Sequence, residues 1–169
     1  LVTRIPTAPS PHWIAMNGDS GFGYVTNHFS DVITVLNLRT NSLTTTIPVG
    51  QGPHSLEMSP DGTRVAVVNY VSDSVSIIDT ATNEVIRSVP RVGAGPQDIT
   101  YAPDGRHFYT ANVDDGTVSV VDVATGTVTA RIATGESPTS VAVLPDGRRA
   151  LVTNFGDGTV SLVDTAAAG

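Results

Sequence analysis

The chain of 169 residues carries 9 basic and 16 acidic side chains, and its net charge of −7 predicts that the phosphate backbone of a nucleic acid is repelled. All basic residues are Arg, which excludes Schiff-base and general-base chemistry by Lys. Cys is absent, which excludes disulfides, thiolate metal sites and a Cys nucleophile, and the short apolar runs predict no membrane span.

Three columns of residues recur in one register across four copies of a repeat. The first column contains Pro11, Pro53, Pro96 and Pro138. The second, at the end of an apolar run in each copy, contains Asn27, Asn69, Asn112 and Asn154. The third contains Asn37, Asp79, Asp122 and Asp164. A period in the low forties, built from short strands, is typical of the blades of a propeller.

The third copy predicts how the strands follow one another. Alternating or apolar segments at 96–101, 107–112, 117–122 and 127–132 are separated by turns rich in Gly, Pro and Asp. Four antiparallel strands repeated radially form a propeller blade. The predicted fold class is therefore all-β, a β-propeller with four blades per chain. The units run approximately over 11–52, 53–95, 96–137 and 138–169, the last together with 1–10.

The two ends of the chain predict how the ring closes. Residues 1–5 match the fourth strand at 128–132, whereas the fourth copy stops after its third strand at 159–164. Pairing of the first strand with the last blade, within one chain or across a dimer, removes the exposed sheet edges. Three arrangements stay open: a closed four-bladed monomer, two chains sharing one eight-bladed ring, and a segment of a longer protein.

Two short motifs carry a resemblance to a known family. Tyr24-Val25-Thr26-Asn27 is the tetrapeptide of the YVTN family of β-propeller repeats, and Pro-Asp-Gly turns follow at residues 60–62, 103–105 and 145–147. The whole chain resembles this family. Similar repeats occur in surface-layer proteins, in the propeller of nitrous oxide reductase, in lactonase-like proteins and in streptogramin lyases. The resemblance implies an extracytoplasmic or cell-surface location, and it does not choose among these functions.

One residue of each copy is predicted to ring the mouth of the central channel, because it directly follows the Pro that opens the innermost strand. These residues are His12, His54, Gln97 and Thr139. Two interpretations are open. His12 and His54 are either metal ligands or a general base and acid, with Asp98 as the carboxylate candidate for the metal. Alternatively, polar side chains simply suit a wet channel entrance.

The loops over the same face supply further candidates for ligand binding. Tyr70 and Phe155 bring aromatic rings close to several loop carboxylates, although Asp-Gly turns need Asp for backbone reasons alone. Arg91 lies in a one-residue insertion and offers a guanidinium to a ligand carboxylate, unless the insertion is merely tolerated. The recurring Asn and Asp columns are predicted to be structural, because a catalytic residue is needed only once.

Three functions follow as hypotheses. The first is a propeller module that binds a small molecule or a protein at a polar, acidic channel mouth. The second, implied by the resemblance, is a metal-assisted lyase or lactonase-like hydrolase that uses His12 and His54 with a divalent metal. The third is a structural repeat protein of the cell surface. Whether the chain is an enzyme stays open, and a homodimer that shares one ring is a further expectation.

Overall fold

The structure is a computed structural model that describes residues 1–18 and 21–165, and all regular elements within these ranges are β-strands. The first blade contains β1 (Pro11–Met16), β2 (Phe22–Asn27), β3 (Val32–Asn37) and β4 (Ser42–Pro48). The second contains β5 (Pro53–Met58), β6 (Arg64–Asn69), β7 (Ser74–Asp79) and β8 (Glu84–Pro90). The third contains β9 (Pro96–Tyr101), β10 (His107–Asn112), β11 (Thr117–Asp122) and β12 (Thr127–Ala133). The fourth contains β13 (Pro138–Val143), β14 (Arg149–Asn154) and β15 (Thr159–Asp164).

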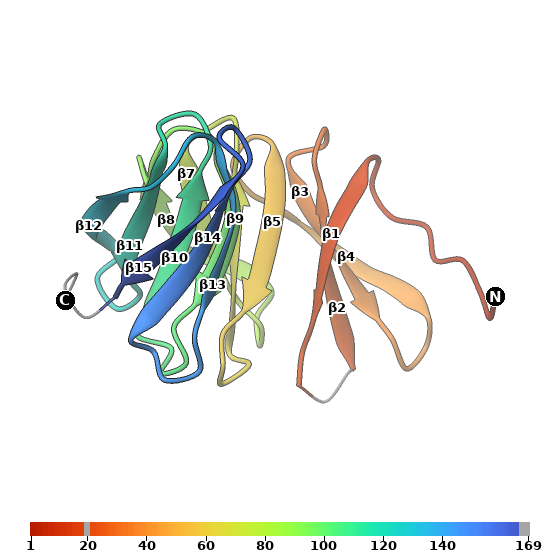
Figure 1. The fold of residues 1–169 in the computed structure, drawn as a ribbon. Helices are drawn as coiled ribbons and strands as arrows, with labels where there is room; N and C mark the ends of the chain where they lie inside the picture. The colour runs from red at the N-terminus through yellow and green to blue at the C-terminus, as the bar shows by residue number, and fades with distance from the viewer. Residues whose placement is uncertain (19–20, 166–169) are drawn as a thin grey trace.

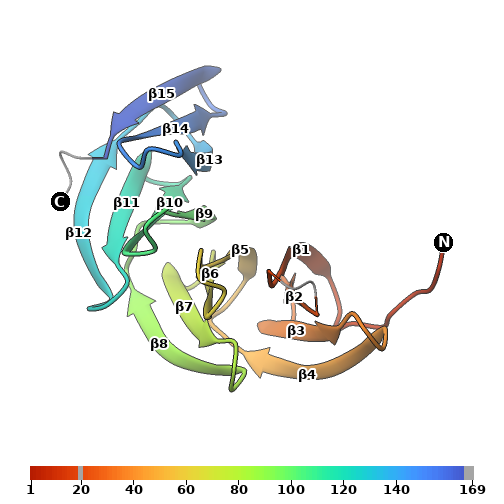
Figure 2. The ribbon, with the colours of Figure 1, turned by 90° about the horizontal axis from the view of Figure 1, so that it is seen from below.

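Each blade is a separate antiparallel sheet in which the strands follow in chain order. The sheets stand side by side along an arc (Figure 1). The innermost strands β1, β5, β9 and β13 line the concave side of this arc, and the outer strands β4, β8 and β12 form its convex side (Figure 2). This arrangement confirms the predicted all-β propeller architecture. Among the described residues, no helix has the length and apolar character needed to cross a membrane.

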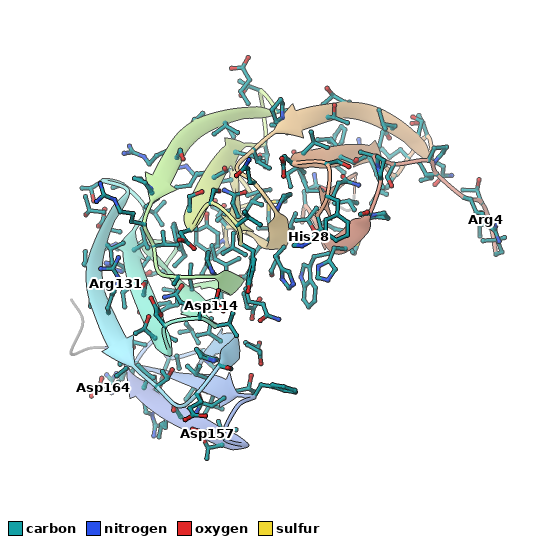
Figure 3. The ribbon with its side chains drawn as sticks, turned by 90° about the horizontal axis from the view of Figure 1, so that it is seen from above. Arg4, His28, Asp114, Arg131, Asp157 and Asp164 are labelled. Carbon is teal, nitrogen blue, oxygen red and sulfur yellow. The ribbon has the colours of Figure 1, made fainter. Side chains whose placement is uncertain are left out.

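The four blades form an open arc. Residues 1–7 lie outside every strand, and β15 pairs with β14 while no described strand follows along its other edge. Arg4 and Asp164 lie at opposite ends of the arc (Figure 3). Residues 1–5 therefore do not pair with β15 of the same chain in this structure. Closure across two chains stays a prediction.

Apolar side chains between neighbouring blades form the core, and they come from equivalent positions at each junction. We call the side of a blade that packs on the next blade its trailing face, and the opposite side its leading face. At the first junction the trailing face contributes Tyr24, Ile33, Val35 and Ile47, and the leading face contributes Leu56, Val65, Val67 and Ile78. The second and third junctions repeat this pattern. Burial of these faces is the main force that holds the blades together.

The repeated Asn and Asp columns stabilise turns and strand ends, as predicted. The Asn69 amide donates to Ser74 Oγ at 3.1 Å and to Ser76 Oγ at 3.0 Å, and Asn112 and Asn154 bond their own hairpins in the same way. Asp79 Oδ1 accepts from the backbone N–H groups of Ala81 and Thr82, both at 2.9 Å. These side chains replace backbone partners at the ends of strands.

Candidate functional site

The structure brings His12 and His54 together at the concave side of the arc. Their ring centroids lie 4.3 Å apart, although the residues come from different blades. His12 Nδ1 lies 3.1 Å from the carbonyl oxygen of His54, and His54 Nδ1 lies 2.8 Å from that of Gln97. A carbonyl can only accept, so both Nδ1 atoms carry the hydrogen in these bonds. Nε2 of each neutral ring is then the lone-pair acceptor, which is the form that binds a metal or a substrate proton.

A third imidazole joins this pair. The ring of His28, in the turn between β2 and β3, lies 5.9 Å from His12 and 5.6 Å from His54, centroid to centroid. Figure 3 shows His28 on the concave side of the arc. Its Nδ1 is buried and has no hydrogen-bond partner within the described ranges. We call His12, His28 and His54 the imidazole cluster.

Sequence reasoning did not include His28 among the site residues, although a signal existed. His28 directly follows Asn27, the recurring Asn of its copy. Tyr70 and Phe155 occupy the equivalent position in their copies, and both were predicted to bind ligand. The side chain in this column starts from the turn between the second and third strands. It therefore projects next to the residue that opens the innermost strand of its own blade.

Aromatic rings surround the imidazole cluster. The half-exposed Trp13 has its ring centroid 6.4 Å from that of His12, and Tyr70 lies 6.2 Å from His54. The exposed ring of Phe29 contacts His28 edge-on at 4.8 Å. The Tyr70 hydroxyl donates to Asp114 at 3.2 Å, which fixes the tyrosine ring beside the cluster. This part of the concave side therefore combines flat rings with hydrogen-bonding nitrogens.

The environment of His54 favours the neutral imidazole. Its pKa lies below the ordinary value of 6.5, mainly because burial disfavours the charged form. The carbonyl of Gln97 and the carboxylate of Asp98 act in the opposite direction, whereas the neighbouring His12 and His28 lower the pKa further. At neutral pH His54 can accordingly accept a proton or a hydrogen bond.

Asp98 is directed to neighbouring blades. Its Oδ1 accepts from Ser55 Oγ at 2.9 Å, and its Oδ2 accepts from Ser140 Oγ at 2.8 Å and from the backbone N–H of Val141 at 3.1 Å. One carboxylate thus links three blades. The described part of the chain holds no group of three or more His, Asp or Glu arranged to hold a metal ion. The metal set of His12, His54 and Asp98 stays a prediction.

The remaining predicted residues lie apart from the imidazole cluster. The Thr139 hydroxyl lies 3.1 Å from that of Thr153 within the fourth blade, and Phe155 is exposed on the turn between β14 and β15. Arg91 lies between β8 and β9, where it lines a cavity of about 240 Å³ together with Arg131. Figure 3 places Arg131 on the convex side. Arg91 therefore lies near the convex side, away from the imidazole cluster.

The blades and their concave polar face define the chain as a β-propeller module. The sequence profile of the YNCE-like beta-propeller matches residues 5–114, so the chain belongs to this family. The profile of the Cytochrome D1 heme domain matches residues 97–167. These matches and the fold confirm the resemblance to YVTN-type propeller repeats.

Two solved structures have the same arrangement of blades. Hydrazine synthase from Kuenenia stuttgartiensis superposes with a TM-score of 0.88 and 27% identity, over 99% of this chain and 49% of that one. A putative 6-phosphogluconolactonase from Bacteroides uniformis superposes with a TM-score of 0.81 and 19% identity, over 91% of this chain and 50% of that one. The chain therefore spans about half the length of these two proteins. The search of curated proteins gave no match.

Proposed function

We propose that the chain is a binding module whose ligand occupies the imidazole cluster at the channel mouth. The observation that carries this proposal is the meeting of three imidazoles from two blades, with ring centroids no more than 5.9 Å apart, on the concave face. Convergent polar groups beside aromatic rings are typical of small-molecule sites. The ligand class that fits is a small hydroxylated molecule, whose hydroxyl groups donate hydrogen bonds to Nε2 of the imidazoles and which stacks on Trp13 or Tyr70.

The fluorescence of Trp13 tests this proposal directly, because it is the only Trp of the chain and its ring lies beside that of His12. Gluconate and glucose are suitable probes of the hydroxylated class. We expect a saturable change in emission for the wild type and at least a tenfold weaker response in the variant that combines His12→Ala with His54→Ala, about 1.4 kcal/mol or more. Thr44→Ala, at an exposed position of the outer strand β4, is the matched control and should bind like the wild type. Equal affinity of the double variant would refute the site.

We propose metal-assisted, lactonase-like hydrolysis as the second function. The lowered pKa of His54 and the closeness of the His12 ring support it, as does the lactonase description of one structural neighbour. A divalent metal bound to the folded state must raise the melting temperature. The expected result is a rise with Zn²⁺ that the double His variant abolishes, together with Zn²⁺-dependent hydrolysis of δ-gluconolactone. If Zn²⁺ leaves the wild-type melting temperature unchanged, the metal-assisted function is wrong.

The partners that we propose follow from the same face. A small molecule is the first, and a protein segment that inserts a polar side chain into the mouth is the alternative. A second copy of the chain, sharing one ring, is a separate partner whose contacts depend on the faces of the two end blades.

A further inference from the structure

The loop between β8 and β9 contains one residue more than the equivalent loop of the first blade. In the first blade, Val49 directly follows Pro48, the last residue of β4. In the second blade, Arg91 stands between Pro90, the last residue of β8, and Val92. The backbone N–H groups of Val49 and Val92 each donate, at 3.0 Å, to the turn between the second and third strands of their own blade. Arg91 is therefore an insertion that the repeat itself does not require.

The inserted residue has an unusual backbone conformation. The φ of Arg91 is 54°, in the left-handed region. The other residues with positive φ in the described ranges, apart from Gly, are Ser, Asn and Asp, all of which have short polar side chains. Asn and Asp tolerate this conformation because they form local hydrogen bonds, whereas the long side chain of Arg gains nothing from it. Strained positions of this kind are common at ligand sites.

The carbonyl oxygen of Arg91 lies beside a second guanidinium. Nη2 of Arg131, on the outer strand β12, donates a hydrogen bond to it. The residues equivalent to Arg131 in the first and second blades are Thr46 and Ser88, which carry no charge. Two Arg residues that the repeat does not require therefore meet at the junction of the second and third blades. Both line the same cavity of about 240 Å³.

Two carboxylates also line this cavity, and both belong to the repeat. Asp73 Oδ1 accepts from the backbone N–H of Gly95 at 2.9 Å. Asp115 Oδ2 accepts from the backbone N–H of Ala94, also at 2.9 Å. Asp31 makes the first of these bonds at the preceding junction, and the fourth blade repeats the second. The scaffold therefore accounts for the two carboxylates, whereas it does not account for the two Arg residues.

We propose that the cavity bounded by Arg91 and Arg131 binds a small carboxylate that also carries a hydroxyl or amino group. A guanidinium binds a carboxylate through two parallel N–H···O bonds. Asp73 and Asp115 can accept hydrogen bonds from the hydroxyl or amino group of the ligand, and their charge disfavours an anion of higher charge such as phosphate. The ligand is small because the cavity is smaller than the pockets of drug-sized ligands, which measure about 300–1,000 Å³.

The backbone amide signals of Gly93 and Ala94 test the proposal by NMR, because both residues line the cavity. Lactate is the probe, added at constant ionic strength so that salt screening does not change. We expect saturable shifts of these two signals in the wild type. Arg131→Gln should bind lactate at least about tenfold more weakly, because it removes a guanidinium. Arg106→Gln is the matched control, since it removes the same charge from an exposed position in the loop between β9 and β10, and it should bind like the wild type.

Arg91→Asn separates ligand binding from backbone conformation. Asn tolerates the left-handed conformation better than Arg, so the melting temperature should not fall, whereas lactate binding should weaken at least about tenfold. The variant that combines His12→Ala with His54→Ala should keep the lactate response of Gly93 and Ala94. Failure of this site is therefore distinguishable from failure of the imidazole cluster.

Several results would overturn the proposal. Lactate that produces no saturable shift at Gly93 and Ala94 is the first, and an Arg91→Asn or Arg131→Gln variant that binds like the wild type is the second. Inorganic phosphate that binds more tightly than lactate would overturn the carboxylate class. A loss of binding in Arg91→Asn together with a lower melting temperature would mean that Arg91 shapes the loop and does not hold the ligand. Circular dichroism of each variant verifies that its blades are folded.

Discussion

The two halves of the concave side use neighbouring positions of the repeat for different chemistry. In the first two blades, polar side chains of the mouth form the imidazole cluster, in which His12 and His54 bond to backbone and retain Nε2. In the third blade, both carboxylate oxygens of Asp98 accept hydrogen bonds from the neighbouring blades. A polar residue on the concave side is therefore available to a ligand only where the protein itself leaves some of its hydrogen bonds unfilled.

The largest expected effect is a loss of stability when the hydrogen bonds of Asp98 between blades are disrupted. Asp98→Asn keeps the shape of the side chain but removes its charge and replaces one acceptor oxygen with a donor, which either opposes the N–H of Val141 or makes the hydroxyl of Ser55 accept instead of donate. Hydrogen bonds to a charged group are each worth about 1.5–3 kcal/mol. We expect the free energy of unfolding, measured with urea, to fall by about 3 kcal/mol.

Asp114→Asn is the control for this change. Its carboxylate accepts an exposed hydrogen bond from Tyr70, so the expected loss is below about 1 kcal/mol. An equal loss in the two variants would show that Asp98 is not the link between blades that the structure indicates.

A smaller effect is expected when single donors of the Asp98 network are removed. Ser55→Ala removes a buried hydroxyl and should cost about 1 kcal/mol, whereas Ser140→Ala removes an exposed one and should cost about 0.5 kcal/mol. Combined with Asp98→Asn, each Ser variant should add little, because its partner is already changed. A double-mutant cycle from urea unfolding measures this coupling, and full additivity would contradict the network.

The comparison also explains what the sequence could and could not predict. The repeat columns predicted the strands and the turns, because these depend on local periodicity and backbone conformation. The left-handed turn positions are an example: Asn41, Asn83 and Gly126 have φ values of 54°, 57° and 69°. This feature repeats in the three copies whose turn the structure describes, and the copies can be compared with one another.

Contacts between blades were harder to predict from the sequence. Asp98 was predicted to be a metal candidate because a carboxylate in an innermost strand can reach the channel, but its partners Ser55 and Ser140 come from blades 43 and 42 residues away in the chain. His28 was not selected because its nearness to His12 and His54 depends on how a turn folds over the inner strands. Both depend on geometry between repeats, about which a repeat pattern carries no information.

The smallest expected effect belongs to the imidazole cluster, and it is a dependence on pH. Because the pKa of His54 is lowered in the folded state, the unfolded state binds the proton more tightly. Stability should therefore fall as the pH drops through 6.5 toward the lower pKa of the folded protein. The neighbouring His12 and His28 lower the pKa of His54 further, whereas Asp98 raises it.

His54→Asn isolates this contribution, because the Asn amide can still donate to the carbonyl oxygen of Gln97 but does not titrate. The melting temperature of the wild type should decrease more between pH 7.5 and pH 5.5 than that of the variant. Asp61 does not contribute to this difference in melting temperature. Hydrogen bonds from Ser59 and Thr63 lower its pKa to about 2, so its stabilisation is lost only well below pH 5.5. Burial raises the pKa of Glu57, which acts in the opposite direction and is common to both proteins. Identical pH profiles would mean that His54 takes up a proton as readily in the folded protein as in the unfolded chain, and would contradict the lowering of its pKa by burial.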